Sequence, residues 1–178
     1  MKIYPIFHAA LPLLLTEIPQ LKKLKINRFF LLVGSLLPDI VDKPLFLFGF
    51  GNGRFFSHNL LFLIISFSIV YLSSKRNKYI SFSFLIGLII HIILDIPHVP
   101  LFYPFISYEF TYLEDPLQNW VLTLLKNPFI LITEIMGFLF VIFILVKYKL
   151  YHIKDIMNYL KGNNQILTQN SKIINSNN

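Results

Sequence analysis

The chain has no cysteine among its 178 residues. Disulfide bonds and thiolate metal sites are therefore excluded, and any bound metal ion needs histidine, aspartate or glutamate ligands. Charged residues are also scarce, at 14% of the chain, whereas soluble domains usually contain about 25%. Hydrophobic residues make up 55% and are gathered into blocks. This composition predicts an integral membrane protein.

Acidic residues are few, and the net charge is +7. A positive balance can indicate nucleic-acid binding, but here the basic residues cluster beside apolar blocks, at 22–25, 75–78 and 147–149. Charges in such positions set the topology of membrane helices. We therefore predict a multi-pass protein of the inner (plasma) membrane, with membrane lipid and not nucleic acid as its partner; the oligomeric state stays open.

The sequence contains neither a Gly-x-Ser-x-Gly elbow nor a P-loop. Their absence argues against serine-hydrolase chemistry and nucleotide-driven chemistry.

Five apolar blocks are candidates for membrane helices. Three of them, at 58–74, 80–97 and 128–147, would each span roughly 25–30 Å as a helix. Two shorter blocks, at 3–16 and 27–40, can cross when packed against the others. With the basic clusters in the cytoplasm, the N-terminus lies outside. The expected fold class is all-α: a polytopic membrane helix bundle of about five transmembrane or partly spanning helices, N-terminus out.

The predicted organisation is a membrane-embedded helical domain over residues 1–160 and a disordered polar tail over 161–178, which is rich in Asn and Ser. Residues 99–127 are rich in aromatic side chains and are expected to form an outer loop in the membrane interface.

Ionisable side chains lie near the outer ends of the predicted helices. They are His8, Asp39, Asp42, His58, His91, Asp95 and His98, with Glu134 at a similar depth. His91 and Asp95 are four residues apart and share one face of a helix. An ionised carboxylate there costs at least ~2.5–3.5 kcal/mol unless it is paired or hydrated. A divalent cation would remove that cost, with zinc favoured over manganese or iron. We predict a metal site with His91 and Asp95 as core ligands.

Each of these residues also has a purely structural explanation. A lone buried histidine is usually hydrogen-bonded, His91 and Asp95 can satisfy each other, and Asp39 after Pro38 can end a helix. An ion- or proton-coupled transporter is an alternative function, although the polar groups gather at one end and no inverted repeat is visible. A second alternative is a non-catalytic protein whose polar layer locks the helices together, at about 0.6 kcal/mol per contact.

Three segments resemble the successive motifs of a protein family. They are GSLLPDIVD at 34–42, GRFFSHNLL at 53–61 and GLIIHIILD at 87–95. They are similar to the motifs of the YdjM-like (LexA-regulated) inner-membrane proteins, which are described as metal-dependent hydrolases. The resemblance covers roughly residues 1–147 and includes an N-terminal histidine, His8.

The chain departs from that family pattern at a few positions. Val41 stands where the second aspartate of the first motif usually follows, and Asp42 is displaced by one residue. In the second motif Ser57 and Asn59 replace Thr and Ser, and each keeps a polar group available.

The resemblance implies a metal-dependent hydrolase. Its metal ligands would be drawn from His8, Asp39, His58, His91 and Asp95, and the ion would activate a water molecule. Asp42 or Glu134 would act as general base or would orient a ligand histidine. Arg54 would hold a phosphate or carboxylate. This set favours an anionic ester or phosphoester substrate, including a lipid of the outer leaflet.

Overall fold

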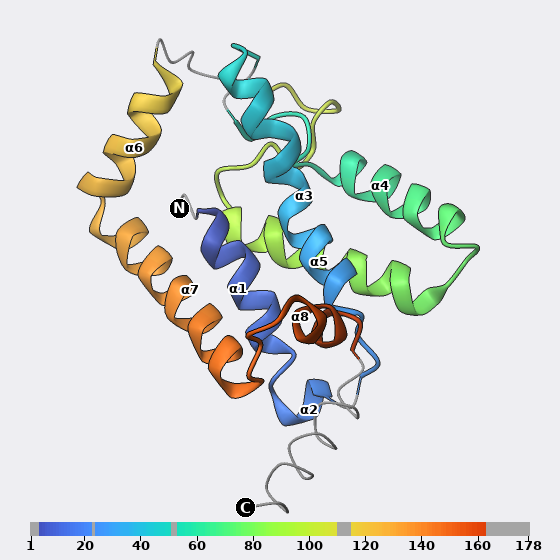
Figure 1. Cartoon of the computed structure of the whole chain (residues 1–178). Helices are drawn as coiled ribbons and strands as arrows, with labels where there is room; N and C mark the ends of the chain where they lie inside the picture. The colour runs from blue at the N-terminus through green and yellow to red at the C-terminus, as the bar shows by residue number, and fades with distance from the viewer. Residues whose placement is uncertain (1–3, 23, 51–52, 110–114, 163–178) are drawn as a thin grey trace, which may run out of the picture.

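The protein is entirely helical over the residues that its computed structural model describes, which are 4–22, 24–50, 53–109 and 115–162 (Figure 1). The helices are α1 (Pro5–Leu15), α2 (Pro19–Lys22), α3 (Arg28–Leu47), α4 (Leu60–Ser73), α5 (Lys78–Asp95), α6 (Pro116–Lys126), α7 (Pro128–Lys147) and α8 (Ile153–Leu160). The all-α prediction is confirmed for this part of the chain. The predicted disordered tail falls almost wholly outside the described residues.

Asparagine caps the start of four helices. The side chains of Asn27, Asn59, Asn77 and Asn127 accept hydrogen bonds from backbone N–H groups in the first turns of α3, α4, α5 and α7. A cap satisfies N–H groups that have no partner within the helix. Each of these four helices therefore begins directly after an asparagine.

Helix α3 is longer than the sequence pattern predicts. The apolar block ends at Ile40, whereas the helix continues to Leu47 with Pro38 and Pro44 inside it. Asp39 is therefore an interior residue of α3, so the interpretation that it ends a helix is wrong. Asp39 and Asp42 are three residues apart, share one side of the helix, and are both buried.

Two further elements differ from the prediction. The expected outer loop at 99–127 contains a helix, α6, and the expected span at 58–74 is shortened to the 14 residues of α4. Of the described helices, α5 and α7 are long and apolar enough to cross a membrane, and α1 and α4 are shorter apolar helices.

Glycines let the helices approach closely. A Cβ atom at Gly34 of α3 would lie 2.1 Å from the Phe84 carbonyl oxygen, and one at Gly87 of α5 would lie 2.1 Å from the Leu31 carbonyl oxygen. The two backbones are thus in direct contact, as in small-residue packing of membrane helices. Helices α1 and α7 also lie side by side and run in the same direction, while α3 runs the opposite way (Figure 1).

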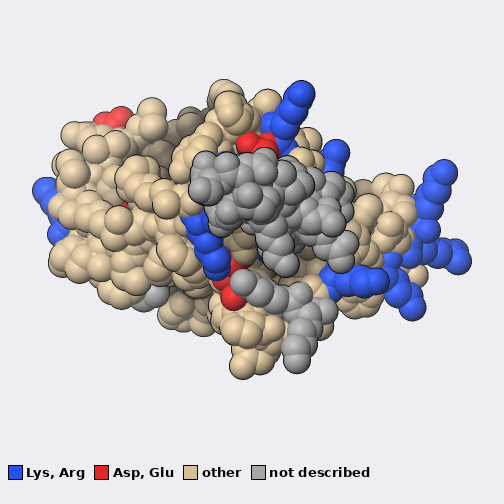
Figure 2. Space-filling model, turned by 60° about the horizontal axis from the view of Figure 1, so that its bottom comes forward, with Lys and Arg blue, Asp and Glu red and all other residues tan. Residues whose placement is uncertain are grey.

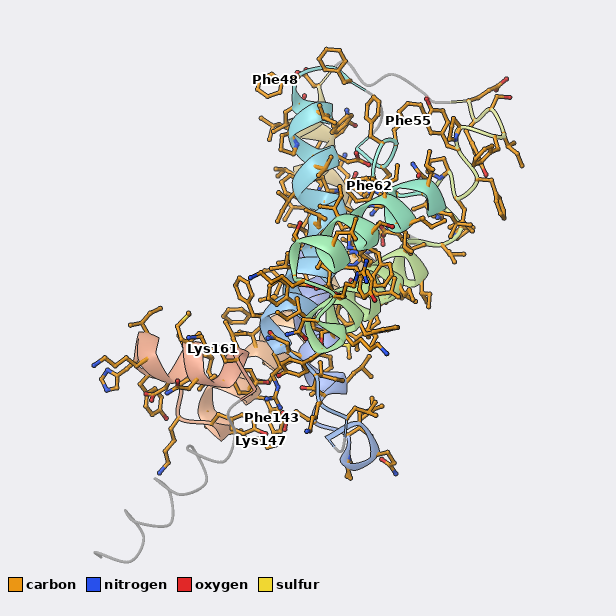
Figure 3. The ribbon with its side chains drawn as sticks, turned by 90° about the vertical axis from the view of Figure 1, so that its right-hand side faces the viewer. Phe48, Phe55, Phe62, Phe143, Lys147 and Lys161 are labelled. Carbon is orange, nitrogen blue, oxygen red and sulfur yellow. The ribbon has the colours of Figure 1, made fainter. Side chains whose placement is uncertain are left out.

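Exposed basic side chains gather in two regions of the molecule. In Figure 3 one end carries Phe48, Phe55 and Phe62, and the other carries Phe143, Lys147 and Lys161. Figure 2 shows prominent Lys and Arg side chains on the bottom face. The exposed basic residues of the α4–α5 turn and of the α7–α8 region are Lys75, Arg76, Lys78, Lys147, Lys149, Lys154 and Lys161.

Candidate metal centre

Four predicted ligands converge in the interior of the protein. They are Asp39 from α3, His58 from the segment before α4, and His91 and Asp95 from α5. One ligand atom from each lies within 4.8 Å of those of the other three, and all four residues are buried. The close contact of α3 with α5 brings Asp39 next to the α5 pair. The structure thus gathers side chains that are far apart in the sequence.

Backbone geometry fixes the tautomer of His91. Its Nδ1 lies 2.6 Å from the carbonyl oxygen of Ser35. A carbonyl oxygen only accepts hydrogen bonds, so Nδ1 carries the proton and donates. In the neutral ring, Nε2 then presents a lone pair.

A carboxylate fixes the tautomer of His58 in the same way. Its Nδ1 lies 2.8 Å from Oδ2 of Asp42. The backbone N–H groups of Phe56 and Ser57 also donate to Asp42 and hold this carboxylate in place. Such a carboxylate–histidine pair is the usual support of a metal-binding imidazole. Asp42 therefore lies where the orienting role, one of its two predicted roles, requires.

The two unprotonated nitrogens face each other. Nε2 of His91 is 3.0 Å from Nε2 of His58, so two neutral rings would point their lone pairs at one another. Oδ2 of Asp95 and Oδ1 of Asp39 lie 3.3 and 3.6 Å from the same His58 nitrogen. A proton or a metal ion between the two nitrogens would relieve the opposition of their lone pairs.

The donor set fits a divalent ion. Two imidazole nitrogens and two carboxylates suit zinc, manganese or iron. Both carboxylate oxygens of Asp39 are buried without a hydrogen bond, although Nζ of Lys43 lies 3.2 Å from Oδ1. A carboxylate that is buried and accepts no hydrogen bond has ligand capacity to spare.

Arg54 binds the second carboxylate of the group. Its Nε lies 2.8 Å from Oδ2 of Asp95, and its Nη2 lies 3.0 Å from Oδ1. This is the two-pronged geometry that makes arginine–carboxylate pairs strong and directional. The predicted anion-binding arginine thus contacts a protein carboxylate and is itself only 5% exposed.

His8 lies at the edge of the four-residue group. Its ring stacks on that of His91, with centroids 4.2 Å apart, and its Nε2 is 3.6 Å from Oδ1 of Asp95. The side chain is fully buried, and neither ring nitrogen makes a hydrogen bond. The fifth predicted ligand is therefore adjacent to the other four, stacked on His91 and beside Asp95.

Glu134 lies apart from the group and contacts the start of α1. Its Oε1 accepts a hydrogen bond from the backbone N–H of Phe7 at 3.2 Å. A negative charge at a helix N-terminus is stabilising. Glu134 thus ties α7 to the helix that carries His8. His98 is exposed, and its backbone N–H donates to the carbonyl oxygen of Asp95.

The sequence reasoning missed several supporting residues. Gly34 and Gly87 bring α3 and α5 together, and their positions in the first and third motifs were a usable signal, because Gly87 lies four residues before His91 on the same helix face. Lys43, four residues after Asp39, could have been found by the same spacing. Ser35 had no signal, because it acts through a carbonyl that every residue has.

Sequence comparison identifies the family. Residues 5–157 match the family described as YdjM inner membrane protein. This stretch includes every residue of the site. The chain belongs to the YdjM inner membrane protein family. No curated protein and no solved structure matches it. Membership confirms both the resemblance and the predicted location in the inner membrane.

Proposed function

We propose that this YdjM family protein is a membrane-bound metal-dependent hydrolase that cleaves an anionic ester or phosphoester at the outer face of the membrane. The observation that carries the proposal is the 3.0 Å approach of two imidazole nitrogens, each with its other nitrogen committed as a donor. Buried beside two carboxylates, this pair has the chemistry of a metal site.

The proposed roles follow from the contacts of each residue. Asp39, His58, His91 and Asp95 hold the ion, and Asp42 and the Ser35 carbonyl keep the two imidazoles in the ligating tautomer. When bound, a divalent ion supplies a Lewis acid and activates a water molecule.

In the proposed reaction His8 is the general base and general acid. Its Nε2 has no hydrogen bond and lies beside Asp95, so it can accept the proton of the attacking water and return it to the leaving oxygen. Arg54 holds Asp95 in its ligating orientation, and Glu134 positions α1, which carries His8.

We further propose that α1, α3, α4, α5 and α7 cross or partly cross the membrane with the N-terminus outside. The parallel course of α1 and α7 and the opposite course of α3 support this orientation for these three helices, while α4 and α5 run across them (Figure 1). The exposed basic residues of the α4–α5 turn and of the α7–α8 region belong on the cytoplasmic side.

An assay of the detergent-purified full chain tests the hydrolase proposal. Bis(p-nitrophenyl) phosphate, a general phosphodiester probe, is expected to be cleaved after loading with zinc or manganese and not after chelation. Asp95→Asn should lower the rate by about a hundredfold or more. Asp115→Asn, a matched change at an exposed residue, should leave it unaltered. Equal rates in both variants, or a rate independent of metal, would contradict the proposal.

A further inference from the structure

Two segments at the outer end of the molecule carry exposed aromatic side chains and no Asp, Glu, Lys or Arg residue. They are residues 44–50, at the end of α3, and residues 96–108, after α5. Phe48 is 78% exposed, Phe50 59%, Phe102 50% and Phe105 82%. We call these two segments the aromatic surface. Figure 3 shows Phe48 at the extremity opposite Lys147 and Lys161.

The aromatic surface is joined directly to the candidate metal centre. Residues 96–108 continue from Asp95, and the backbone N–H of His98 donates to the Asp95 carbonyl. The ring of Tyr103 lies 4.4 Å from that of Phe55, next to Arg54. The backbone N–H of Leu60 donates to the carbonyl oxygen of Leu101. The segment that supplies His58 is thus held against the aromatic surface.

The chemistry of this surface fits a lipid interface and not bulk water. Large exposed apolar patches mark sites of interaction, and aromatic side chains concentrate where a membrane meets water. The end away from Phe48 in Figure 3, by contrast, carries Lys147 and Lys161, which are both exposed.

One cation lies at the border between the aromatic surface and the metal centre. Lys43 directly precedes residues 44–50, and its side chain is 24% exposed. Its Nζ lies 3.2 Å from Oδ1 of Asp39. A molecule with apolar chains and an anionic headgroup would place its chains along the aromatic surface and its charge near Lys43.

We propose that the aromatic surface is seated in the outer leaflet and that the substrate of the metal centre is an anionic phospholipid of that leaflet. This inference rests on the hydrolase function proposed above. Water is the only co-reactant: its oxygen bonds to the phosphorus or acyl carbon, the ester bond breaks, and one water proton passes to the leaving oxygen.

A pair of substrates that differ only in chain length tests the inference. Phosphatidylglycerol with long acyl chains, in mixed micelles, is compared with dibutyryl phosphatidylglycerol, which is soluble. Phe48→Ser combined with Phe105→Ser should lower cleavage of the long-chain lipid about tenfold, through lost apolar contact, and leave the soluble analogue unaffected. Ile153→Ser, at a residue that is 73% exposed on α8, is the matched control and should change neither rate. Equal losses on both substrates, or no loss on either, would overturn the inference.

A fluorescence measurement shows whether the aromatic surface lies in lipid or in water, and it does not depend on hydrolysis. Trp120 is the single tryptophan, so Trp120→Phe with Phe105→Trp places one reporter on the aromatic surface. In reconstituted vesicles, lipids brominated near the carbonyl groups should quench it strongly, and aqueous iodide weakly. The reverse order would overturn the inference. Strong quenching by lipid with no hydrolysis of either substrate would instead show that the hydrolase proposal had failed, and the substrate assignment with it.

Discussion

At the scale of single residues, the proposed function depends on which nitrogens of His58 and His91 hold protons. The Ser35 carbonyl and the Asp42 carboxylate each accept from an Nδ1–H group, which leaves both Nε2 atoms as acceptors 3.0 Å apart. A purely structural polar layer would be expected to pair donors with acceptors. Two neutral rings here would set acceptor against acceptor, an arrangement that takes up a cation, either a proton or a metal ion.

A substitution at Asp42 tests whether its pairing with His58 supports metal binding. Asp42→Asn keeps the size of the side chain but removes the charge that supports His58. Because such supporting carboxylates affect metal binding strongly, affinity for zinc should fall about 10–100-fold. Competition with a chromogenic chelator in detergent measures it.

Asp115→Asn serves as the control, since Asp115 is exposed and precedes α6. Unaltered zinc affinity in Asp42→Asn would show that the pairing with His58 has no part in metal binding.

The four residues that converge could be predicted from the sequence as metal ligands, but the contact that Arg54 makes could not. Histidine and aspartate in an apolar helix are costly in any membrane protein, which made His91 and Asp95 visible from the sequence alone. Arg54 was predicted to bind substrate, whereas it binds Asp95. Which carboxylate an arginine contacts depends on the path of the segment from Gly53 to Asn59, and no periodicity encodes that path.

At the scale of elements, the contact between α3 and α5 builds the centre. Both helices are positioned by a glycine that lies against the backbone of the other. Helix α5 has only a weakly one-sided apolar pattern, so its pairing with α3 could not be predicted from the sequence. The contact places the Ser35 carbonyl against His91 and brings Asp39 toward His58.

Gly87→Ala tests the helix contact. The added methyl group would lie 2.1 Å from the Leu31 carbonyl oxygen and 2.8 Å from the Ser35 backbone nitrogen. The helices must separate, at a cost of about 1–3 kcal/mol of stability. We expect a lower Tm in detergent together with weaker metal binding.

Phe82→Leu on the same helix is the control, because Phe82 is 50% exposed and faces away from this contact. Equal Tm values for Gly87→Ala and the unmodified protein would mean that the close approach does not stabilise the fold.

Element boundaries were the weakest part of the sequence prediction. Hydropathy placed the end of the second block at Ile40, yet α3 extends to Leu47 because proline within a helix can be tolerated when neighbouring helices support it. Helix α6 was missed although Leu117, Trp120, Val121 and Leu124 recur at helical spacing, because they lie inside an aromatic-rich stretch that was interpreted as a loop.

At the scale of the whole molecule, a buried network holds together the end opposite the aromatic surface. Arg28 donates to Thr16 and lies 4.4 Å from the ring of Tyr159, while Glu17 accepts from Lys147 and Tyr148. These contacts join α1, α3, α7 and α8. One end of the protein is thus fastened by ion pairs, and the other carries the metal centre beneath apolar segments.

Cysteine labelling tests the orientation of the two ends. Because the chain has no cysteine, a single one introduced at exposed Ser107 or exposed Asn77 reports without background. An impermeant maleimide added to cells with a permeabilised outer envelope should label Ser107→Cys and not Asn77→Cys. Disruption of the inner membrane, as a control, should allow both to react. Labelling of Asn77→Cys alone in intact cells would move the metal centre to the cytoplasmic side.

Metal content is the most direct measure of the central claim. Elemental analysis of the detergent-purified full chain should find about one zinc, manganese or iron ion per chain. His91→Ala should reduce that content to background, while His152→Ala, at an exposed histidine outside the centre, should keep it. A chain that carries no ion, cannot be loaded with one, and behaves the same with or without His91 would contradict the account.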